Sequence, residues 1–202
     1  MFWDFDGVIK ETVKVKGVAF AELFRVHGEA LAGKIRKHHT LHGGVSRMKK
    51  IPLYLKWAGL ARDPITVGQY CERFARVVYQ GVMEAPWVPG AEDFLRRNPF
   101  GQKFFLVTAT PQKEVETILA ALDLAGSFDG IWGAPTTKSE AIRKVLAASG
   151  VASDRCLLVG DSLTDHQAAL ATNIPFLLRE HADNRNLPWN QSPPCISDFL
   201  NL

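Results

Sequence analysis

Acidic side chains gather at two places in this sequence, each directly after an apolar run. Asp4 and Asp6 follow the apolar start of the chain, and Asp161 and Asp165 follow the run that ends at Gly160. Carboxylates that converge in one place repel one another strongly unless a cation neutralises them. Mg²⁺ prefers such oxygen ligands and completes its shell with water and phosphate oxygens. The pattern therefore predicts a magnesium site.

Groups that suit a phosphate occur at two further points. Thr108 ends another apolar run, and Thr110-Pro111 after it predicts a helix that starts at the site, with Thr110 as its N-cap. The free N–H groups and positive dipole end of such a helix attract anions. Lys138 adds a charge that can bridge a carboxylate and phosphoryl oxygens. An aspartate could then attack phosphorus, while a carboxyl two residues along protonates the leaving oxygen and later deprotonates water.

These residues need a framework that brings them together. In the second half of the chain, apolar runs alternate with amphipathic segments, and the connections are short. The expected strands are 104–107, 128–132, 156–159 and 175–178, and the expected helices contain 115–122, 139–148 and 163–171. This alternation, with a first strand before Asp4, predicts a Rossmann-like parallel sheet in a three-layer α/β/α core. Ligands of such sheets bind beyond the carboxyl ends of the strands, where the acidic residues lie.

Only helical periodicity appears between the first expected strand and residue 81. Phe20 and Phe24 mark one helix, and Phe74 and Val78 lie on the apolar face of a second. We therefore expect an α-helical cap domain, residues 13–85, inserted into a core of residues 1–12 and 86–202. The cap is predicted to move as a lid, with hinges near 10–12 and 84–89.

In their order along the chain, these motifs resemble the four signature motifs of the haloacid dehalogenase superfamily. They are Asp4-Phe5-Asp6-Gly7-Val8-Ile9, Thr108, Lys138 and Gly160-Asp161-Ser162-Leu163-Thr164-Asp165. The resemblance implies that Asp4 is the nucleophile and Asp6 the acid/base. It implies that Thr108, Ala109 and Lys138 hold the phosphoryl group. It also implies that Asp161 joins Asp4 and the Asp6 carbonyl around Mg²⁺, with Asp165 supporting the metal or the lysine.

The stretch from His42 to Arg47 resembles the cap loop of the β-phosphoglucomutase and phosphoglycolate-phosphatase-like branch, in which an arginine reaches into the active site. Arg47 would then bind a phosphate or carboxylate of the substrate. The alternative is a helix N-terminus with Ser46 as its cap and Arg47 in solvent. Lys50, one turn further along, fits either role.

The resemblance implies a Mg²⁺-dependent phosphatase that acts on a small phosphorylated metabolite, such as a sugar phosphate, through an aspartyl-phosphate. Asp6 argues against dehalogenases and phosphonate hydrolases, which lack that second aspartate. A phosphomutase of the β-phosphoglucomutase type stays open, although Lys16 stands where those enzymes have a histidine. A non-catalytic sugar-phosphate-binding protein is the alternative from another class.

Several candidate residues have simpler explanations. Ser162 with Asp165, and Thr137 with Glu140, form capping boxes at expected helix starts, so Asp165 and Lys138 could have only local roles. For His38, His39 and His42 we expect a solvated helix end or loop rather than a metal site, because no carboxylate or cysteine accompanies them.

The composition excludes several classes of protein. The chain has 202 residues, a net charge of +3, 47% hydrophobic and 22% charged residues. These values are typical of one globular domain with or without an insertion. There is no apolar run near ~20 residues, no secretory signal and no strongly basic balance. We expect a cytoplasmic monomer or weak homodimer without a nucleic-acid or membrane partner. The three cysteines are expected to be buried thiols: Cys71, Cys156 and Cys195.

The first expected strand is short for a buried one. Strands usually run about five or six residues, and Asp4 already follows Met1, Phe2 and Trp3. Phe2 and Trp3 should both be buried, on opposite faces of the sheet. Two explanations stay open. Either upstream residues lengthen the strand in the natural or expressed protein, or a short central strand suffices because its neighbours hydrogen-bond it on both sides.

Overall fold

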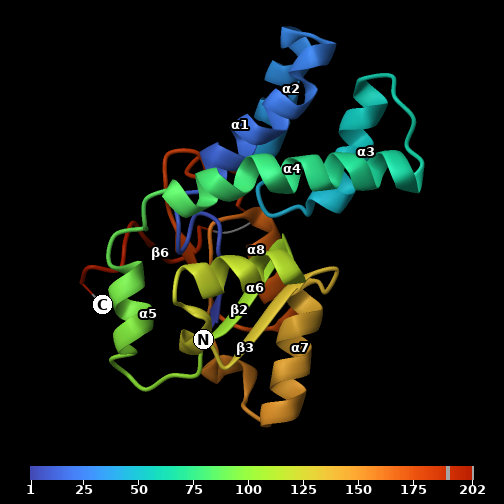
Figure 1. Cartoon of the computed structure of the whole chain (residues 1–202). Coiled ribbons are helices and arrows are strands. Elements are labelled where there is room, and N and C mark those ends of the chain that lie inside the picture. The colour runs from blue at the N-terminus through green and yellow to red at the C-terminus, as the bar shows by residue number, and fades with distance from the viewer. Residues whose placement is uncertain (190–191, 202) are drawn as a thin grey trace.

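A six-stranded parallel sheet forms the centre of the structure, a computed structural model that describes residues 1–189 and 192–201 (Figure 1). The strand order is β3-β2-β1-β4-β5-β6. The strands are β1 (Phe2–Trp3), β2 (Phe105–Pro111), β3 (Gly130–Ala134), β4 (Leu158–Gly160), β5 (Phe176–Arg179) and β6 (Cys195–Ile196). The predicted parallel sheet is confirmed, and β6 is an edge strand that the sequence patterns did not predict.

The short strand β1 lies in the middle of the sheet. Phe2 pairs with Phe105 of β2 on one side and with Leu158 of β4 on the other. Phe2 and Trp3 are both buried, and they belong to different hydrophobic clusters, one on each face of the sheet. Their predicted burial on opposite faces is therefore confirmed.

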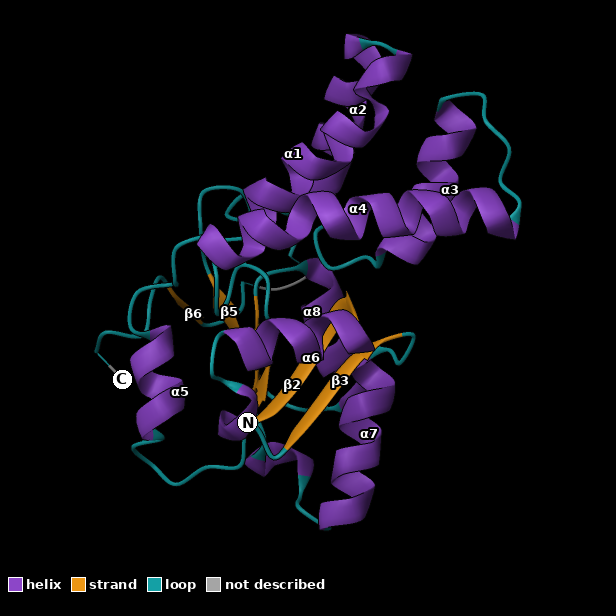
Figure 2. Cartoon of the chain, in the orientation of Figure 1, coloured by secondary structure: helices purple, strands orange, loops and turns teal. Residues whose placement is uncertain are grey.

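Helices cover both faces of the sheet (Figure 2). The core helices are α5 (Ala91–Arg97), α6 (Gln112–Ala121), α7 (Lys138–Ser149) and α8 (Leu163–Thr172). Helices α5 and α6 share a cluster with Trp3, whereas α7 and α8 share the other cluster with Phe2. This is the predicted three-layer α/β/α core. Three short 3₁₀ helices complete the described elements: η1 (Arg25–His27), η2 (Ala125–Ser127) and η3 (Ser153–Arg155).

The inserted segment after β1 consists of helices that lie at the top of Figure 1. They are α1 (Val13–Phe24), α2 (Glu29–Leu41), α3 (Arg47–Trp57) and α4 (Pro64–Glu84). Aromatic side chains hold them together: the rings of Phe20 and Phe74 stack at 3.9 Å, and Tyr54 packs edge-on against Phe20. These residues are buried, so the insertion has an apolar interior of its own.

The two segments that connect the insertion to the core lie side by side. Lys10 and Trp87 form an antiparallel bridge, and the Glu11 N–H donates to the Pro86 carbonyl at 2.9 Å. These segments coincide with the predicted hinges at 10–12 and 84–89.

Two boundaries differ from the predictions in ways that affect the site. Strand β2 continues to Pro111, which pairs with Ala134 of β3 after a register shift, and α6 begins only at Gln112. The prediction of Thr110 as an N-cap is therefore wrong, because Thr110 is still part of the strand. Helix α7 begins at Lys138, one residue earlier than expected.

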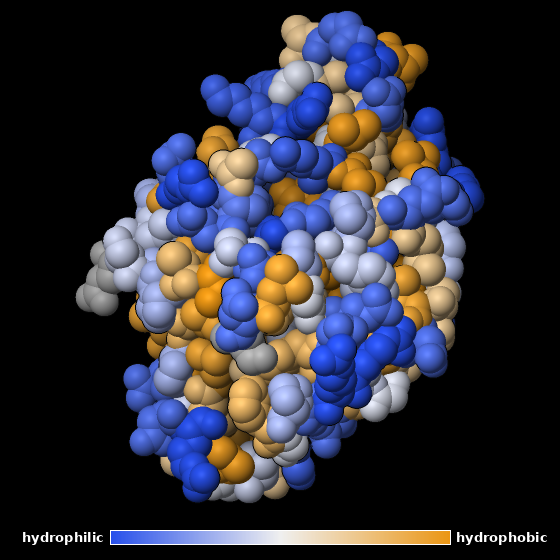
Figure 3. All heavy atoms as spheres, turned by 90° about the vertical axis from the view of Figure 1, so that its left-hand side faces the viewer, coloured by the Kyte–Doolittle hydropathy of each residue, from blue (hydrophilic) through white to orange (hydrophobic). Residues whose placement is uncertain are grey.

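The surface is mixed. Polar and apolar residues alternate in small groups over the face in Figure 3, and no described helix is long and apolar enough to cross a membrane. The expectation of buried thiols is wrong for Cys195, which is exposed in the edge strand, and Cys71 and Cys156 are only half-buried.

Candidate active site

Three buried carboxylates meet at the carboxyl ends of β1 and β4. Asp4 follows β1, Asp161 follows β4, and Asp165 lies in the first turn of α8. One oxygen of each lies within 4.8 Å of the others. Gly160 makes this approach possible, because a Cβ at that position would lie 2.3 Å from the Cβ of Asp165.

Glycine is also required at position 7, beside Asp161. Gly7 has φ +71°, and a Cβ there would lie 2.2 Å from Asp161 Oδ2. Any other L-residue would therefore be strained and would displace the carboxylate.

Lys138 is the cation at the centre of this cluster. Its Nζ lies 2.8 Å from Asp4 Oδ2 and also forms an ion pair with Asp165 Oδ1. Burial acts to lower the pKa of Lys138, but Asp165 and Asp4 outweigh it and raise the pKa above its usual value. Lys138 is therefore an ammonium group at neutral pH.

Burial raises the pKa of Asp4 well above its usual value, against the charge of Lys138, and the neighbouring carboxylates raise it further. Burial also raises the pKa of Asp161. Three carboxylates thus face one buried ammonium, and a divalent cation would complete the balance of charge. Because the donors are all oxygens, the cluster of Asp4, Asp161 and Asp165 fits a hard cation such as Mg²⁺.

Asp6 lies beside this cluster, and both of its carboxylate oxygens have partners. Oδ1 accepts from the Thr12 hydroxyl and Oδ2 pairs with Lys16 Nζ, each at 2.5 Å. Lys16 also donates to the Thr110 hydroxyl at 2.9 Å. Burial acts to raise the pKa of Asp6, but Lys16 and Thr12 outweigh it and lower the pKa below its usual value.

Thr108 and Ala109 complete the predicted phosphate site. Thr108 is buried, and its hydroxyl accepts from the Thr110 N–H at 3.3 Å. Thr108 and Lys138 line a cavity of about 610 Å³, and Ala109 lines both this cavity and a small space that it shares with Asp4 and Asp6. The structure therefore brings these predicted core residues to one place.

Both capping boxes are present, and they do not compete with the site. The Asp165 carboxylate accepts from the Ser162 N–H and hydroxyl and still pairs with Lys138. Thr137 caps α7 with Glu140, and Lys138 is buried rather than solvated.

The insertion adds Arg47, which also lines the small space beside Asp6. Ser46 caps α3, as the alternative interpretation of this stretch predicted. Arg47, however, is only 6% exposed and therefore does not lie in solvent. Its guanidinium lies 2.5 Å from Glu114 of α6 and stacks over the Phe74 ring.

One of the three histidines near Leu41 is buried, and His38 is half-buried. His39 is only 3% exposed, which contradicts the expectation for it, and His38 bonds to the Tyr54 hydroxyl at 2.9 Å. His39 Nδ1 lies 3.0 Å from Lys50 Nζ, which also donates to the Gly43 carbonyl at 3.2 Å. Lys50 thus supports the loop before Arg47 from inside the insertion.

Lys50 makes stability depend on pH. Burial lowers the pKa of its ammonium group from 10.5 to about 7, with Lys16 adding to the effect. The folded state therefore releases a proton that the unfolded chain keeps, and stability from this residue rises between pH 7 and 10.5. Each pH unit between the two pKa values corresponds to about 1.4 kcal/mol in the free energy of unfolding. A hydrogen bond that is lost when Lys50 is replaced contributes only about 1 kcal/mol.

We expect Lys50→Met to raise the melting temperature at pH 7 and below, with the gain fading towards pH 10. Thermal unfolding at several pH values measures this. Lys49→Met is the matched control, because Lys49 is exposed. A gain in melting temperature that is independent of pH would contradict the lowered pKa of Lys50.

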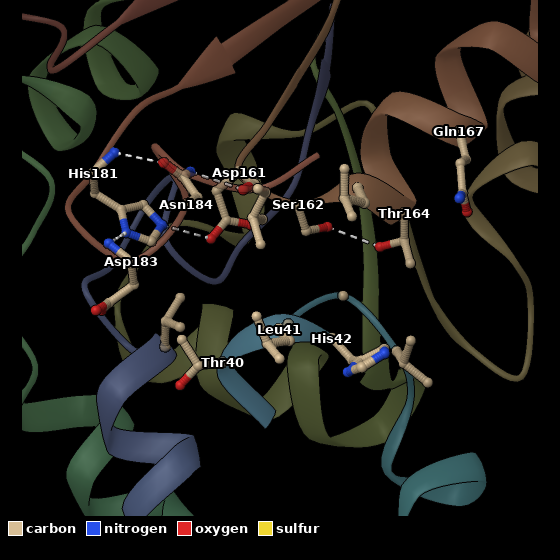
Figure 4. A pocket seen from close by; sticks show the side chains of 16 residues that line it. Thr40, Leu41, His42, Asp161, Ser162, Thr164, Gln167, His181, Asp183 and Asn184 are labelled. Atoms are coloured by element: carbon tan, nitrogen blue, oxygen red, sulfur yellow. Dashed lines mark hydrogen bonds and ion pairs between the residues drawn. The ribbon is translucent and has the colours of Figure 1, made fainter. Parts of the chain in front are cut away.

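His181 is a site residue that the sequence patterns did not indicate (Figure 4). Its Nε2 lies 3.1 Å from Asp161 Oδ2, and its Nδ1 accepts from the Asp183 N–H. Nε2 therefore carries the proton that is donated to Asp161. Asn184 donates to the Asp161 and Arg179 carbonyls, each at 2.8 Å, which ties the segment after β5 to Asp161.

The chain is similar to known proteins both in sequence and in fold. A family model described as "Haloacid dehalogenase-like hydrolase" matches residues 1–178. A phosphoglycolate phosphatase of Pseudomonas savastanoi pv. phaseolicola is 24% identical over 204 residues, which cover 97% of this chain and 74% of that protein.

Two solved structures share the whole fold. CbbY from Rhodobacter sphaeroides in complex with phosphate matches with a TM-score of 0.77 at 19% identity, over 100% of this chain and 94% of that one. A CbbY mutant in complex with xylulose-(1,5)bisphosphate matches with a TM-score of 0.75 at 18% identity and the same coverage. At these identities the likeness is one of fold.

Proposed function

Because the chain belongs to the haloacid dehalogenase-like hydrolase family, we propose that it is a Mg²⁺-dependent phosphatase that hydrolyses a small phosphorylated metabolite through an aspartyl-phosphate on Asp4. The observation that carries this proposal is the buried Asp4–Lys138 pair, at 2.8 Å, beside two further carboxylates. The names of the relatives, a phosphoglycolate phosphatase and CbbY in complex with phosphate, support it.

Asp4 is the nucleophile. Its Oδ1 accepts from the Phe5 N–H at 2.7 Å and its Oδ2 faces Lys138, so the carboxylate cannot rotate freely. Attack joins a carboxylate oxygen to phosphorus as the bond to the leaving oxygen breaks, and Asp6 gives that oxygen a proton. Water then loses a proton to Asp6 and attacks phosphorus, which breaks the bond between phosphorus and the Asp4 oxygen and releases inorganic phosphate. Lys16 and Thr12 favour the carboxylate form of Asp6, which this second step requires. Asp6 must therefore take up a proton before it can act as the acid in the first step.

Thr108, the Ala109 backbone and Lys138 hold the phosphoryl group. Lys138 Nζ lies 2.8 Å from Asp4 Oδ2, and Ala109 lines both the cavity that contains Thr108 and Lys138 and the small space that contains Asp4. Asp4, Asp161 and the Asp6 carbonyl would hold Mg²⁺, with Asp165 behind them. When bound, the ion supplies positive charge against the phosphoryl oxygens.

A phosphate-release assay tests the proposal. Phosphorylated metabolites and p-nitrophenyl phosphate are offered with Mg²⁺ and with a chelator, and the products are separated. We expect inorganic phosphate only with the metal. A rearranged phosphate ester would indicate the mutase instead, and binding without turnover would indicate the non-catalytic alternative.

His181 is expected to tune the metal site through Asp161. Removing an outer partner of a ligand typically weakens metal binding by about 10–100-fold, so His181→Ala should raise the half-saturating Mg²⁺ concentration by that factor. The Mg²⁺-dependent rise in melting temperature should shift in parallel. His27→Ala, an exposed histidine of the insertion, is the control. An unchanged Mg²⁺ dependence of both quantities would exclude this role.

The insertion, residues 13–85, closes as a lid over the core of residues 1–12 and 86–202. Gly44 lies directly against the start of α8: a Cβ there would lie 1.8 Å from Thr164 Oγ1 and 2.4 Å from Ser162 Oγ. At the neighbouring Gly43, the nearest atom would be 3.9 Å away.

We expect Gly44→Ala to hold the lid away from the core and to lower kcat by about tenfold to a hundredfold, since small misplacements at a reaction centre have effects of that size. Gly43→Ala should stay near the native rate. Steady-state kinetics of the two variants measure this, and equal rates would contradict closure at Gly44.

A further inference from the structure

The charges beneath the insertion bear on which leaving group the site accepts. Arg47 is the residue expected to bind a second anionic group of the substrate. Its guanidinium is already paired with Glu114, and the two side chains are 5% and 15% exposed. The pair links α3 of the insertion to α6 of the core, so the closed site contains a neutral pair instead of a free cation.

Two other buried cations that lie beside Asp4 and Asp6 are paired as well. Lys16 faces Asp6, and Lys138 faces Asp4 and Asp165. Among the described residues that line the cavities around these aspartates, the remaining lysine is Lys49, which is exposed at the rim. A carboxylate or second phosphate brought beside Arg47 would therefore also meet the negative charge of Glu114.

A second pocket, of 290 Å³, lies on the other side of Gly44 and is drawn in Figure 4. No lysine or arginine is among the described residues that line it. Its polar groups are hydroxyls, amides and histidines, together with the Asp161 and Asp183 carboxylates, for example Thr40, Thr164, Gln167 and Asn184. This lining suits hydroxyl groups and disfavours anions.

His39 places a buried polar side chain beside the site. It lines the same small spaces as Asp6 and Lys16, and its Nε2 is buried without a hydrogen-bond partner among the described residues. Burial, Lys50 and Lys16 hold the pKa of His39 well below its usual value, so the ring is neutral. With Lys50 as the donor to Nδ1, the proton is on Nε2, which is then a hydrogen-bond donor in a residue that lines these spaces.

We propose, on the basis of the phosphatase function above, that the substrate is a phosphate monoester of a neutral hydroxylated compound. His39 Nε2 donates to an oxygen of the leaving group, and Glu114 sets the specificity by cancelling the charge of Arg47. A leaving group with a second anion is disfavoured. Phosphoglycolate, named for the relatives, has such a leaving group.

Two small esters of nearly equal size test the charge argument: 2-hydroxyethyl phosphate and phosphoglycolate, which differ in a hydroxymethyl group against a carboxylate. We expect kcat/KM to favour 2-hydroxyethyl phosphate by about tenfold or more, the size of one charged hydrogen bond. Equal or better turnover of phosphoglycolate would overturn the proposal.

Glu114→Gln should reverse the preference, because it frees Arg47. We expect kcat/KM for phosphoglycolate to rise about tenfold through KM, with less than about a threefold change for 2-hydroxyethyl phosphate. Glu116→Gln on the same helix, where Glu116 bonds to Gln112, is the matched control and should change neither. A loss on both esters would mean that Glu114 has only a structural role and would overturn its assignment.

His39→Phe keeps the ring and removes the donor. This substitution should raise KM for 2-hydroxyethyl phosphate more than KM for p-nitrophenyl phosphate. Equal changes in the two KM values would overturn the proposed contact between His39 and the leaving group. If no ester is hydrolysed, the phosphatase function fails on its own. The same pair of esters then tests the charge argument by ligand-induced thermal stabilisation, in the native protein and in Glu114→Gln. If phosphoglycolate stabilises the native protein more than 2-hydroxyethyl phosphate does, the charge argument is overturned.

Discussion

Asp4→Asn is expected to abolish phosphate release, by about 10⁴-fold or more, as for other enzymes that lose their nucleophile. An amide at this position keeps the shape and the hydrogen bond from the Phe5 N–H but cannot form the phosphoenzyme. Steady-state phosphate release with Mg²⁺ measures the loss.

The fold should survive this change, because Lys138 keeps its ion pair with Asp165. Circular dichroism and stabilisation by inorganic phosphate serve as controls for folding and for the phosphate site. Near-native turnover by a folded Asp4→Asn protein would contradict the assignment of Asp4.

Asp6→Asn is expected to slow turnover by about 10²–10⁴-fold, the usual contribution of a general acid/base. The loss should depend on the leaving group. An alkyl ester needs a proton on its leaving oxygen, whereas p-nitrophenolate leaves without one. Water activation suffers in both cases.

Stopped-flow kinetics separate the two steps. With p-nitrophenyl phosphate, Asp6→Asn should still release one equivalent of p-nitrophenolate in a burst and then turn over slowly. With an alkyl ester the burst should disappear. Identical losses in both steps for both esters would mean that Asp6 acts through its ion pair with Lys16 rather than as the acid/base.

The acidic residues of the site were predictable because their positions follow from the sheet. Asp4 and Asp161 come directly after short apolar runs, and parallel strands end at one edge. Lys138 was predictable only through the order of the motifs. Helix capping alone would have placed it in solvent, whereas in the structure it is buried and paired with Asp4 and Asp165.

Other contacts depend on long-range packing, and local patterns carry no signal for them. His181 follows β5 in an irregular stretch, yet it meets Asp161, twenty residues earlier. In the sequence, Glu114 is indistinguishable from an ordinary acidic residue in the first turn of a helix, here α6. Only the packing of the insertion against the core brings Arg47 to it. His39 lies between two other histidines, and only the fold of the insertion buries it.

The error at Thr110 has a similar cause. A threonine followed by proline is a good local signal for a helix start, but pairing with β3 extends β2 through Pro111. The Thr110 hydroxyl is then free to accept from Lys16, a contact between core and insertion. Tertiary pairing thus overrode the local preference.

The covalent state of Asp4 during turnover tests the central claim most directly. The protein is mixed with Mg²⁺ and a substrate, quenched in acid within milliseconds, digested, and analysed by mass spectrometry. We predict one phosphoryl group on the N-terminal peptide, attached to Asp4, which is absent without substrate and absent in Asp4→Asn. Rapid turnover with no phosphorylated Asp4 at any quench time, or phosphate on a different residue, would contradict the mechanism.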